Sequence, residues 1–230
     1  METQYPSWNL RLVNAFVGML TGAPGLPSDL REQGYRLHYM EMPFRNSRDD
    51  IVKPELIMYS RPNTHAVMIE GKTGGNIDLD QLSRYQDVTS RDLIERAKVP
   101  RDAFTTHELW MVVGNKPDIC ASVLEENGYH CPLLYTDEEV DALRLVRGKV
   151  IDSEVHQRLT AGIAVDWTTV PVQFVPIDLD TPAHIITSFV GPAVVRCLIS
   201  SGQGRISVSS LYSEVIPQIE SFSPNTVHLA

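Results

Sequence analysis

One stretch of the chain, KPELIMYSRPNTHAVMIEGKTGGNIDLDQLSRY at positions 53–85, combines acidic and basic residues with two short apolar runs. Glu55 opens the first run, and Glu70 and Lys72 close the second. Side chains two positions apart on a strand point to the same face, so Glu70 and Lys72 share a face. If Glu55 begins the neighbouring strand, its carboxylate can converge on that of Glu70.

These residue types suit the hydrolysis of a phosphodiester. The carboxylates of Glu55 and Glu70, together with the backbone carbonyl of Gly71, offer the hard oxygen ligands that Mg²⁺ or Mn²⁺ prefers. A lysine beside such an ion can orient an attacking water, while the ion lowers the pKa of that water and neutralises charge on the phosphate. We therefore expect a metal site at Glu55, Glu70 and Gly71, with Glu55, Glu70 and Lys72 as the catalytic residues.

The same segment resembles the PD-(D/E)xK superfamily, the restriction-endonuclease-like nucleases. Pro54-Glu55 is similar to its PD element, with Glu in place of Asp, and Glu70-x-Lys72 is similar to its (D/E)xK element. Gln81-Leu82-Ser83-Arg84-Tyr85 looks like the Q-x-x-x-Y motif of RecB-like members. The resemblance covers roughly residues 7–136. It implies that Gln81 and Tyr85 support the active site and contact nucleic acid, and Arg84, inside the motif, could meet a phosphate.

Several assignments stay open at this level. Asp50 is an alternative to Glu55 as the first acid, and Glu32 or Glu41 could supply a further acid that family members carry on a helix. Glu70 and Lys72 could also form an ordinary ion pair at a strand edge. Gln81 and Tyr85, four residues apart, could simply face each other on a helix.

Other motifs are better explained structurally. The GKT at 71–73 is no phosphate-binding loop, because Ala66 stands where that motif needs glycine. Zinc would need ligands among Cys120, Cys131, His130 and His107, whose spacing lacks paired knuckles, so buried thiols are the better interpretation. The charged run over 84–102 has five cations and four acids, which is typical of a solvated face.

The elements that must position these residues follow from hydrophobic periodicity and turn signals. Asp78 can cap the helix that carries Gln81, and Gly128 can end a later one. The acids and cations at opposite ends of 137–147 suit the dipole of a helix. In order, the expected elements are a helix over 7–20, strands over 35–41, 55–59 and 66–69, a helix over 79–88, a strand over 109–113, a helix over 118–126, a strand over 131–135 and a helix over 137–147.

This order predicts an α/β (α+β) fold with a mixed central sheet flanked by helices, as in restriction-endonuclease-like proteins. We expect a nuclease-like domain over 1–150 and a small, mainly helical module over 151–230. Beyond position 150 only three of the 20 Lys and Arg residues remain, against seven acids. A helix from 181, a second from 192, a glycine turn at 201–204 and a third helix over 207–216 are compatible with a winged-helix-like module.

The composition limits the function further. The chain has 230 residues, 43% hydrophobic and 21% charged, so a folded protein is expected rather than a disordered one. No apolar run is long enough for a membrane helix, and three cysteines without a C-x-x-C pair fit a reducing cytoplasm. The net charge of -9 argues against coating nucleic acid by charge alone.

We therefore expect a Mg²⁺- or Mn²⁺-dependent nuclease that acts on DNA, with a setting in restriction, repair or defence against phage implied by the resemblance. A homodimer or a larger protein partner could supply the basic groove that the acidic chain lacks. The alternatives are a catalytically inactive scaffold of the same fold and a DNA-binding regulator built on the C-terminal helices.

Overall fold

The computed structural model describes residues 8–171 and Leu198. The chain divides into two compact units, Met1–Val172 and Gln173–Ala230, and only the first is described below. The first unit runs past the expected boundary at residue 150 and includes a further helix and strand. The helices expected from position 181 onward, and with them the winged-helix-like arrangement, lie outside the described residues apart from Leu198.

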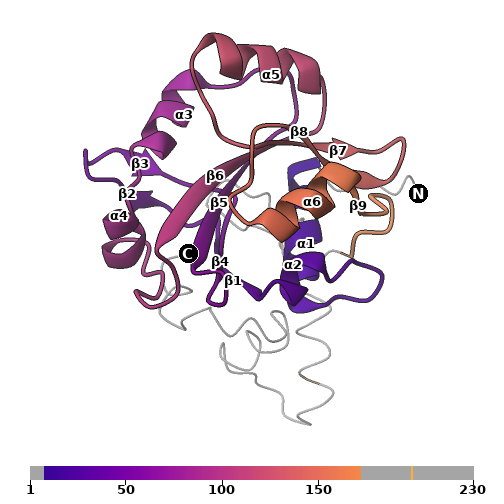
Figure 1. Cartoon of the computed structure of the whole chain (residues 1–230), viewed down its shortest axis with the longest axis horizontal. Coiled ribbons are helices and arrows are strands. Elements are labelled where there is room, and N and C mark those ends of the chain that lie inside the picture. Colours follow the sequence, from indigo (N-terminus) through magenta and orange to yellow (C-terminus); the bar gives the residue numbers. More distant parts are fainter. Residues whose placement is uncertain (1–7, 172–197, 199–230) are drawn as a thin grey trace. The chain divides into compact units, whose positions relative to one another are not determined.

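A mixed sheet forms the centre of the first unit (Figure 1). Its strands lie in the order β1-β4-β5-β6-β7-β8-β9, and β2 and β3 form a separate two-stranded hairpin. The bounds are β1 Tyr35–Met40, β2 Phe44–Arg45, β3 Ile51–Val52, β4 Leu56–Ser60, β5 His65–Lys72, β6 Thr106–Val113, β7 Leu133–Asp137, β8 Ala142–Arg147 and β9 Ile163–Ala164.

The direction of the strands changes twice across the sheet. β1, β4 and β5 are antiparallel neighbours, and Leu56 pairs with Ile69 in the β4–β5 hairpin. β5, β6 and β7 are parallel, and Lys72 pairs with Val113. β7, β8 and β9 are antiparallel again. The expected mixed sheet with flanking helices is therefore confirmed.

Helices cover both faces of this sheet (Figure 1). Helices α1, α2 and α6 pack on one face, mainly over β1, β5 and β8. Helices α3, α4 and α5 lie over the other, where they close a core around the central strands that includes Met68, Leu82, Leu93 and Leu124. The bounds are α1 Trp8–Thr21, α2 Asp29–Glu32, α3 Leu79–Gln86, α4 Ser90–Glu95, α5 Pro117–Glu126 and α6 Ser153–Ala161.

Strand β5 lies in the interior of the sheet, between β4 and β6, and is buried on both sides. A Cβ at Gly71 would lie 2.7 Å from Leu12 Cδ2, so this side of β5 packs directly against α1. Met68 faces the opposite core, and strand alternation carries Glu70 and Lys72 to that same side. Glu70 is consequently a buried acid, with 4% of its surface exposed, under the helices that follow β5.

The helix expected over 137–147 is wrong, because this segment forms the β7–β8 hairpin. The side chain of Asp137 accepts hydrogen bonds from the backbone of Glu139 and Val140, and Asp141 has φ 49°, so a turn replaces the first helical residues. The cations that suggested a helix C-terminus instead lie on β8, where Arg144 pairs with Asp137 across the hairpin at 3.5 Å. Opposite charges at the two ends of a segment fit a hairpin as well as a helix dipole.

The helix α4 falls in the charged run over 84–102 and was not expected from the sequence. Thr89 and Asp92 form a capping box at its start, in which each side chain binds the backbone of the other residue. Arg91 on its exposed side pairs with Glu95 one turn later, at 2.9 Å.

Within the described residues, no helix is long and apolar enough to cross a membrane.

Candidate active site

The carboxylate of Glu70 is held by three side chains from β5 and α3. Gln81 Nε2 donates to Glu70 Oε1 at 2.8 Å, and the Tyr85 hydroxyl donates to Glu70 Oε2 at 2.8 Å. The ammonium of Lys72 lies 2.9 Å from Glu70 Oε1. The structure thus brings together four residues that the sequence selected on pattern alone.

Lys72 is fixed by the same group. Its Nζ donates to Gln81 Oε1 at 2.6 Å, so the amide of Gln81 bridges Lys72 and Glu70. The side chain of Lys72 keeps 24% of its surface exposed, against 5% for that of Glu70. The ammonium therefore reaches the solvent boundary while its partner acid stays buried.

Local sequence explains why α3 presents these side chains. Asp78 caps the helix by accepting a hydrogen bond from the backbone of Gln81 at 2.9 Å, as expected. Gln81 and Tyr85 are one turn apart and so face the same way, toward the end of β5. Leu82 and Tyr85 are both buried in the core beneath, which fixes the rotation of the helix about its axis.

Burial holds Tyr85 in its protonated form. Its exposed fraction is 2%, and burial, followed by the charge of Glu70, raises the pKa of the Tyr85 hydroxyl far above its ordinary value. Tyr85 therefore acts as a hydrogen-bond donor to Glu70 over the whole working pH range.

Glu55 directly precedes β4, the strand that pairs with β5, and lies near Glu70. Its backbone N–H donates to the carbonyl of Ile69 at 2.9 Å, which extends the β4–β5 pairing by one residue. Burial, the carboxylate of Glu41 and the charge of Glu70 together raise the pKa of Glu55 to about 9. Without a cation beside it, Glu55 is therefore protonated at neutral pH in the folded protein.

One carboxylate oxygen of Glu55 lacks a partner. Oε1 accepts a long hydrogen bond of 3.4 Å from Asn9 Nδ2 on α1, whereas Oε2 is buried and meets no donor within the described residues. Because Glu55 is protonated without a metal, its proton can bind the carboxylate of Glu41, which lies within hydrogen-bonding reach. A cation that enters the cluster would displace this proton and bind the oxygen instead.

Glu41 completes the acidic cluster. It directly follows β1, its φ is 52°, and its backbone N–H donates to the carbonyl of Glu55 at 3.0 Å. Its carboxylate lies within hydrogen-bonding reach of that of Glu55, and Lys53 pairs with its Oε2 at 2.7 Å. Of the two candidates for a further acid, the structure brings Glu41 to the site. Glu32 lies on α2 and pairs with Arg158 at 3.3 Å.

Other residues singled out from the sequence lie nearby but outside this network. Asp50 accepts a hydrogen bond of 3.4 Å from Asn46 in the turn between β2 and β3. Arg84 lies on α3, and its carbonyl accepts from Asn46 at 3.1 Å. Within the described part of the chain, the Arg84 side chain forms no ion pair and its buried Nε has no acceptor. For the carbonyl of Gly71, the role of metal ligand stays a prediction.

The thiols and imidazoles considered for zinc do not gather. Cys120 is buried in α5, and its thiol contacts the carbonyl of Gly74 at 4.0 Å. His107 is engaged elsewhere, through Val88 and Ser90. Burial raises the pKa of the Cys131 thiol to about 11, which suits an inert core thiol better than a metal-binding thiolate.

The donor types of the acidic cluster fit a hard divalent cation. Glu55 and Glu70 supply carboxylates, and the unpartnered Oε2 of Glu55 is an oxygen that such an ion would satisfy. Among residues 8–171, however, no three His, Cys, Asp or Glu side chains converge closely enough to form a ready-made metal site. Both oxygens of Glu70 are occupied by Lys72, Gln81 and Tyr85.

Sequence reasoning alone could not place Glu41 or Asn9 in this cluster. The resemblance places the further acid on a helix, whereas Glu41 lies in the turn directly after β1. Asn9 gave no signal, because an exposed amide in the first turn of a helix is common. What brings both to Glu55 is the packing of α1 and β1 against the β4–β5 hairpin.

Comparison with known proteins adds one similarity. Residues 8–109 match the model of a family described as the MJECL32 domain. The matched region runs from α1 into β6 and contains Glu55, Glu70, Lys72, Gln81 and Tyr85. No curated protein and no solved structure matches the chain.

Proposed function

We propose that this protein is a Mg²⁺- or Mn²⁺-dependent nuclease that hydrolyses phosphodiester bonds of DNA. The observation that carries the proposal is the convergence of Glu55, Glu70 and Lys72 at adjacent strand ends, with Gln81 and Tyr85 of α3 bonded to Glu70. This is the set expected from the PD-(D/E)xK resemblance, and it joins residues from three separate elements. The choice of DNA over RNA rests on that resemblance alone.

Each side chain has a distinct part in this proposal. Glu55 and Glu70 would hold the metal, and Glu41 would share in neutralising it through its contact with Glu55. When bound, the ion would lower the pKa of a water and offset the charge of the phosphate. The ammonium of Lys72, at the solvent boundary, would hydrogen-bond and orient that water. Gln81 and Tyr85 would keep Lys72 and Glu70 in position.

The hydrogen bonds of Glu70 indicate what metal binding requires. With both oxygens occupied, Glu70 can turn a lone pair toward Glu55 only if a donor shifts. Lys72 is the donor best able to move, because its side chain is partly exposed whereas Tyr85 is buried. Metal entry would thereby free the ammonium of Lys72 for water or phosphate.

The test is cleavage of labelled single-stranded, duplex and branched DNA, with Mg²⁺, with Mn²⁺ and with EDTA. The Glu70→Gln variant keeps the size of the side chain and removes its charge, and Lys149→Gln, an exposed lysine beyond β8, serves as the matched surface control. We expect metal-dependent cleavage by the wild type and by Lys149→Gln, and none by Glu70→Gln. Equal cleavage by Glu70→Gln in a folded protein would refute the assignment of the site.

A second candidate is a catalytically inactive scaffold of this fold that binds DNA or a partner protein. It is favoured by one observation, namely that Glu70 is already saturated by protein donors, as a purely structural acid would be. Absence of both cleavage and calorimetric metal binding would select this alternative. Metal binding that Glu70→Gln removes, without cleavage on any substrate, would instead point to a nuclease that needs a partner.

A further inference from the structure

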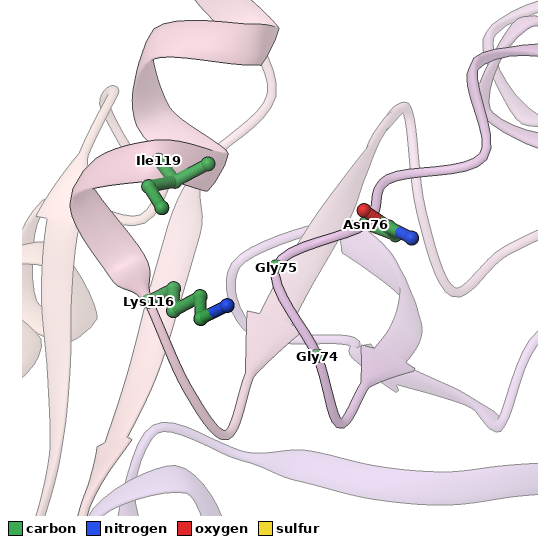
Figure 2. Close-up of a pocket in the computed structure, with 5 residues that line it drawn as sticks. All are labelled: Gly74, Gly75, Asn76, Lys116 and Ile119. Carbon is green, nitrogen blue, oxygen red and sulfur yellow. The ribbon is translucent and has the colours of Figure 1, made fainter.

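A cavity lies at the same edge of the sheet as the acidic cluster. It has a volume of about 320 Å³ and is lined by Gly74, Gly75, Asn76, Lys116 and Ile119 (Figure 2). Because β5 and β6 are parallel, the loops that follow them leave the sheet side by side, and Gly114 N–H donates to the carbonyl of Lys72 at 3.0 Å. Ligands of such sheets commonly bind beyond the carboxyl ends of the strands.

The cavity and the acidic cluster share one short loop. Gly74 follows Lys72 by two residues, a distance that the extended chain can span in at most about 7 Å. The same loop then continues to Asp78, which caps the helix carrying Gln81 and Tyr85. A group bound in the cavity would therefore lie close to a phosphate held at Lys72.

Lys116 supplies a positive charge that has no ion-pair partner among the described residues. Within residues 8–171 its side chain makes no ion pair and no hydrogen bond, although the chain as a whole carries a net charge of -9. Lys116 has φ 51°, a left-handed conformation unusual for a lysine, and its side chain extends from the start of α5 toward Gly74 and Gly75 (Figure 2). A cation that lines a cavity and has no ion-pair partner in the described structure is suited to an anionic ligand.

The glycines of the loop make room for that side chain and leave donors free. A Cβ at Gly75 would lie 2.9 Å from Lys116 Cδ, so the stem of Lys116 lies close against the loop at this glycine and would have to shift for a larger residue. A Cβ at Gly74 would meet nothing within 4 Å, so the cavity is open at that point. In the described structure, the backbone N–H groups of Gly74, Gly75 and Asn76 donate no hydrogen bond. Successive free amides of this kind are suited to phosphate oxygens.

We infer that this cavity is a phosphate subsite, which binds a backbone phosphate of the nucleic acid next to the one held at Lys72. This inference rests on the proposed function, since it names how the same site would grip its substrate. Lys116 supplies the charge, the loop amides and Asn76 supply hydrogen bonds, and Ile119, which is 51% exposed, offers apolar surface to a sugar. Asp118 follows Lys116 in sequence but does not line the cavity.

Binding of a fluorescein-labelled 20-nucleotide single strand, and of its duplex, in EDTA tests the inference without cleavage. Lys116→Gln removes the charge, Lys116→Arg keeps it, and Gly75→Ala displaces the lysine stem. Lys149→Gln makes the same change of charge at the other end of the sheet. We expect Lys116→Gln and Gly75→Ala to bind about tenfold more weakly, with the salt slope of Lys116→Gln reduced by roughly one contact, and Lys116→Arg and Lys149→Gln to bind like the wild type.

A second measurement locates the binding. The amide signals of Gly74 and Gly75 in ¹⁵N NMR spectra should shift when the oligonucleotide is added, and Lys116→Gln should abolish the shift. Equal weakening by Lys116→Gln and Lys149→Gln would overturn the inference, because it would reveal only a general effect of charge. Shifts with inorganic phosphate but not with the oligonucleotide would overturn it as well, in favour of a small phosphorylated ligand.

The two proposals fail in different ways. If cleavage depends on Glu70 but binding is indifferent to Lys116, the nuclease stands and the subsite is wrong. If no substrate is cleaved but binding depends on Lys116 and Gly75, the subsite stands and the inactive scaffold becomes the better account of the protein.

Discussion

Strand β5 carries one buried ionisable side chain at each end, and the groups that surround these two side chains differ in kind. His65 at the amino end is 1% exposed, and Glu70 at the carboxyl end is 4% exposed. The same strand and nearly the same burial therefore allow a direct comparison of what surrounds each group.

At the amino end of β5, both ring nitrogens of His65 have a partner in the protein. His65 Nδ1 lies 2.9 Å from Thr106 Oγ1, and its Nε2 lies 3.0 Å from Glu108 Oε1. Both oxygens of Glu108 also accept from the backbone N–H of Ile151 at 3.2 Å. This network ties β5 to β6 and to the chain before α6.

At the carboxyl end of β5, the carboxylates do not all have hydrogen-bond donors among the described residues. Glu70 is satisfied, but Glu55 beside it keeps a buried oxygen without a donor and contacts the carboxylate of Glu41. The difference indicates that burial alone does not mark a functional acid. Glu70 is fully hydrogen-bonded and still belongs to the candidate site, and Glu55 beside it has the raised pKa that a bound cation would lower.

The first prediction separates the two ends by activity. Lys72→Met keeps the length of the stem and removes the ammonium, so cleavage should fall by about 10² to 10⁴. The free energy of unfolding should change by less than about 1 kcal/mol, because Gln81 and Tyr85 still satisfy Glu70 and the lost ion pair is partly exposed. Steady-state cleavage and urea denaturation give the two values. A large loss of stability would show that Lys72, at the carboxyl end of β5, is needed for the fold as well.

The second prediction concerns the amino end. Glu108→Ala leaves the buried ring of His65 without one of its partners, so the free energy of unfolding should fall by about 3 kcal/mol. Cleavage per folded molecule should stay near that of the wild type. Urea denaturation measures the first effect, and a cleavage rate that drops in parallel with Lys72→Met would erase the distinction between the ends.

The third prediction uses the metal as the missing partner. A cation at a hundred times its dissociation constant should stabilise the fold by about 2.7 kcal/mol, which corresponds to a rise in Tm of roughly 5 to 10 °C. Thermal unfolding with and without Mg²⁺ or Mn²⁺ should show this rise for the wild type and for the exposed-site control Glu126→Gln. The rise should vanish in Glu55→Gln. Persistence of the full rise in that variant would place the ion elsewhere.

The fourth prediction follows from the raised pKa of Glu55. Unfolding returns this pKa from about 9 to its ordinary value of 4.5, so between these values the folded protein holds a proton that the unfolded chain releases. Stability should therefore fall as the pH rises through this window, with a slope of at most about 1.4 kcal/mol per pH unit from this group. Urea denaturation of Glu55→Gln without metal should show a shallower fall than the wild type. Identical slopes would mean that Glu55 is already ionised in the fold.

Much of this comparison was accessible from the sequence, because the site residues are tied to strong local signals. The apolar runs before Glu70 and after Glu55 predicted β5 and β4, and Asp78 predicted the start of α3. Once the strand–strand–helix order is known, alternation and the helical repeat bring Glu70, Lys72 and Gln81 together.

The remainder depends on packing that no local pattern encodes. The charges over 137–147 suited a helix, and only the turn at Asp141 and the pairing of β8 with β7 and β9 decide otherwise. The expected strand began at position 66, so His65 fell in the loop before it, and its partner Glu108 comes from a distant strand. Glu41 could be assigned to the site only after β1 was known to lie beside β4.

The last and smallest predicted effect tests whether the hydrogen bond from Tyr85 to Glu70 contributes to cleavage or only to stability. Tyr85→Phe removes one hydrogen bond to Glu70 Oε2 but leaves the ring in the core and the bonds from Gln81 and Lys72 in place. The free energy of unfolding should fall by about 1 kcal/mol, and urea denaturation can resolve this change. Because the freed oxygen can then accept a metal-bound water as readily as it accepted the tyrosine, cleavage should fall less than about tenfold. A loss as large as that of Lys72→Met would instead make Tyr85 a positioning residue for the reaction. The hydrogen bond from Tyr85 to Glu70 would then contribute to catalysis as well as to the stability of the fold.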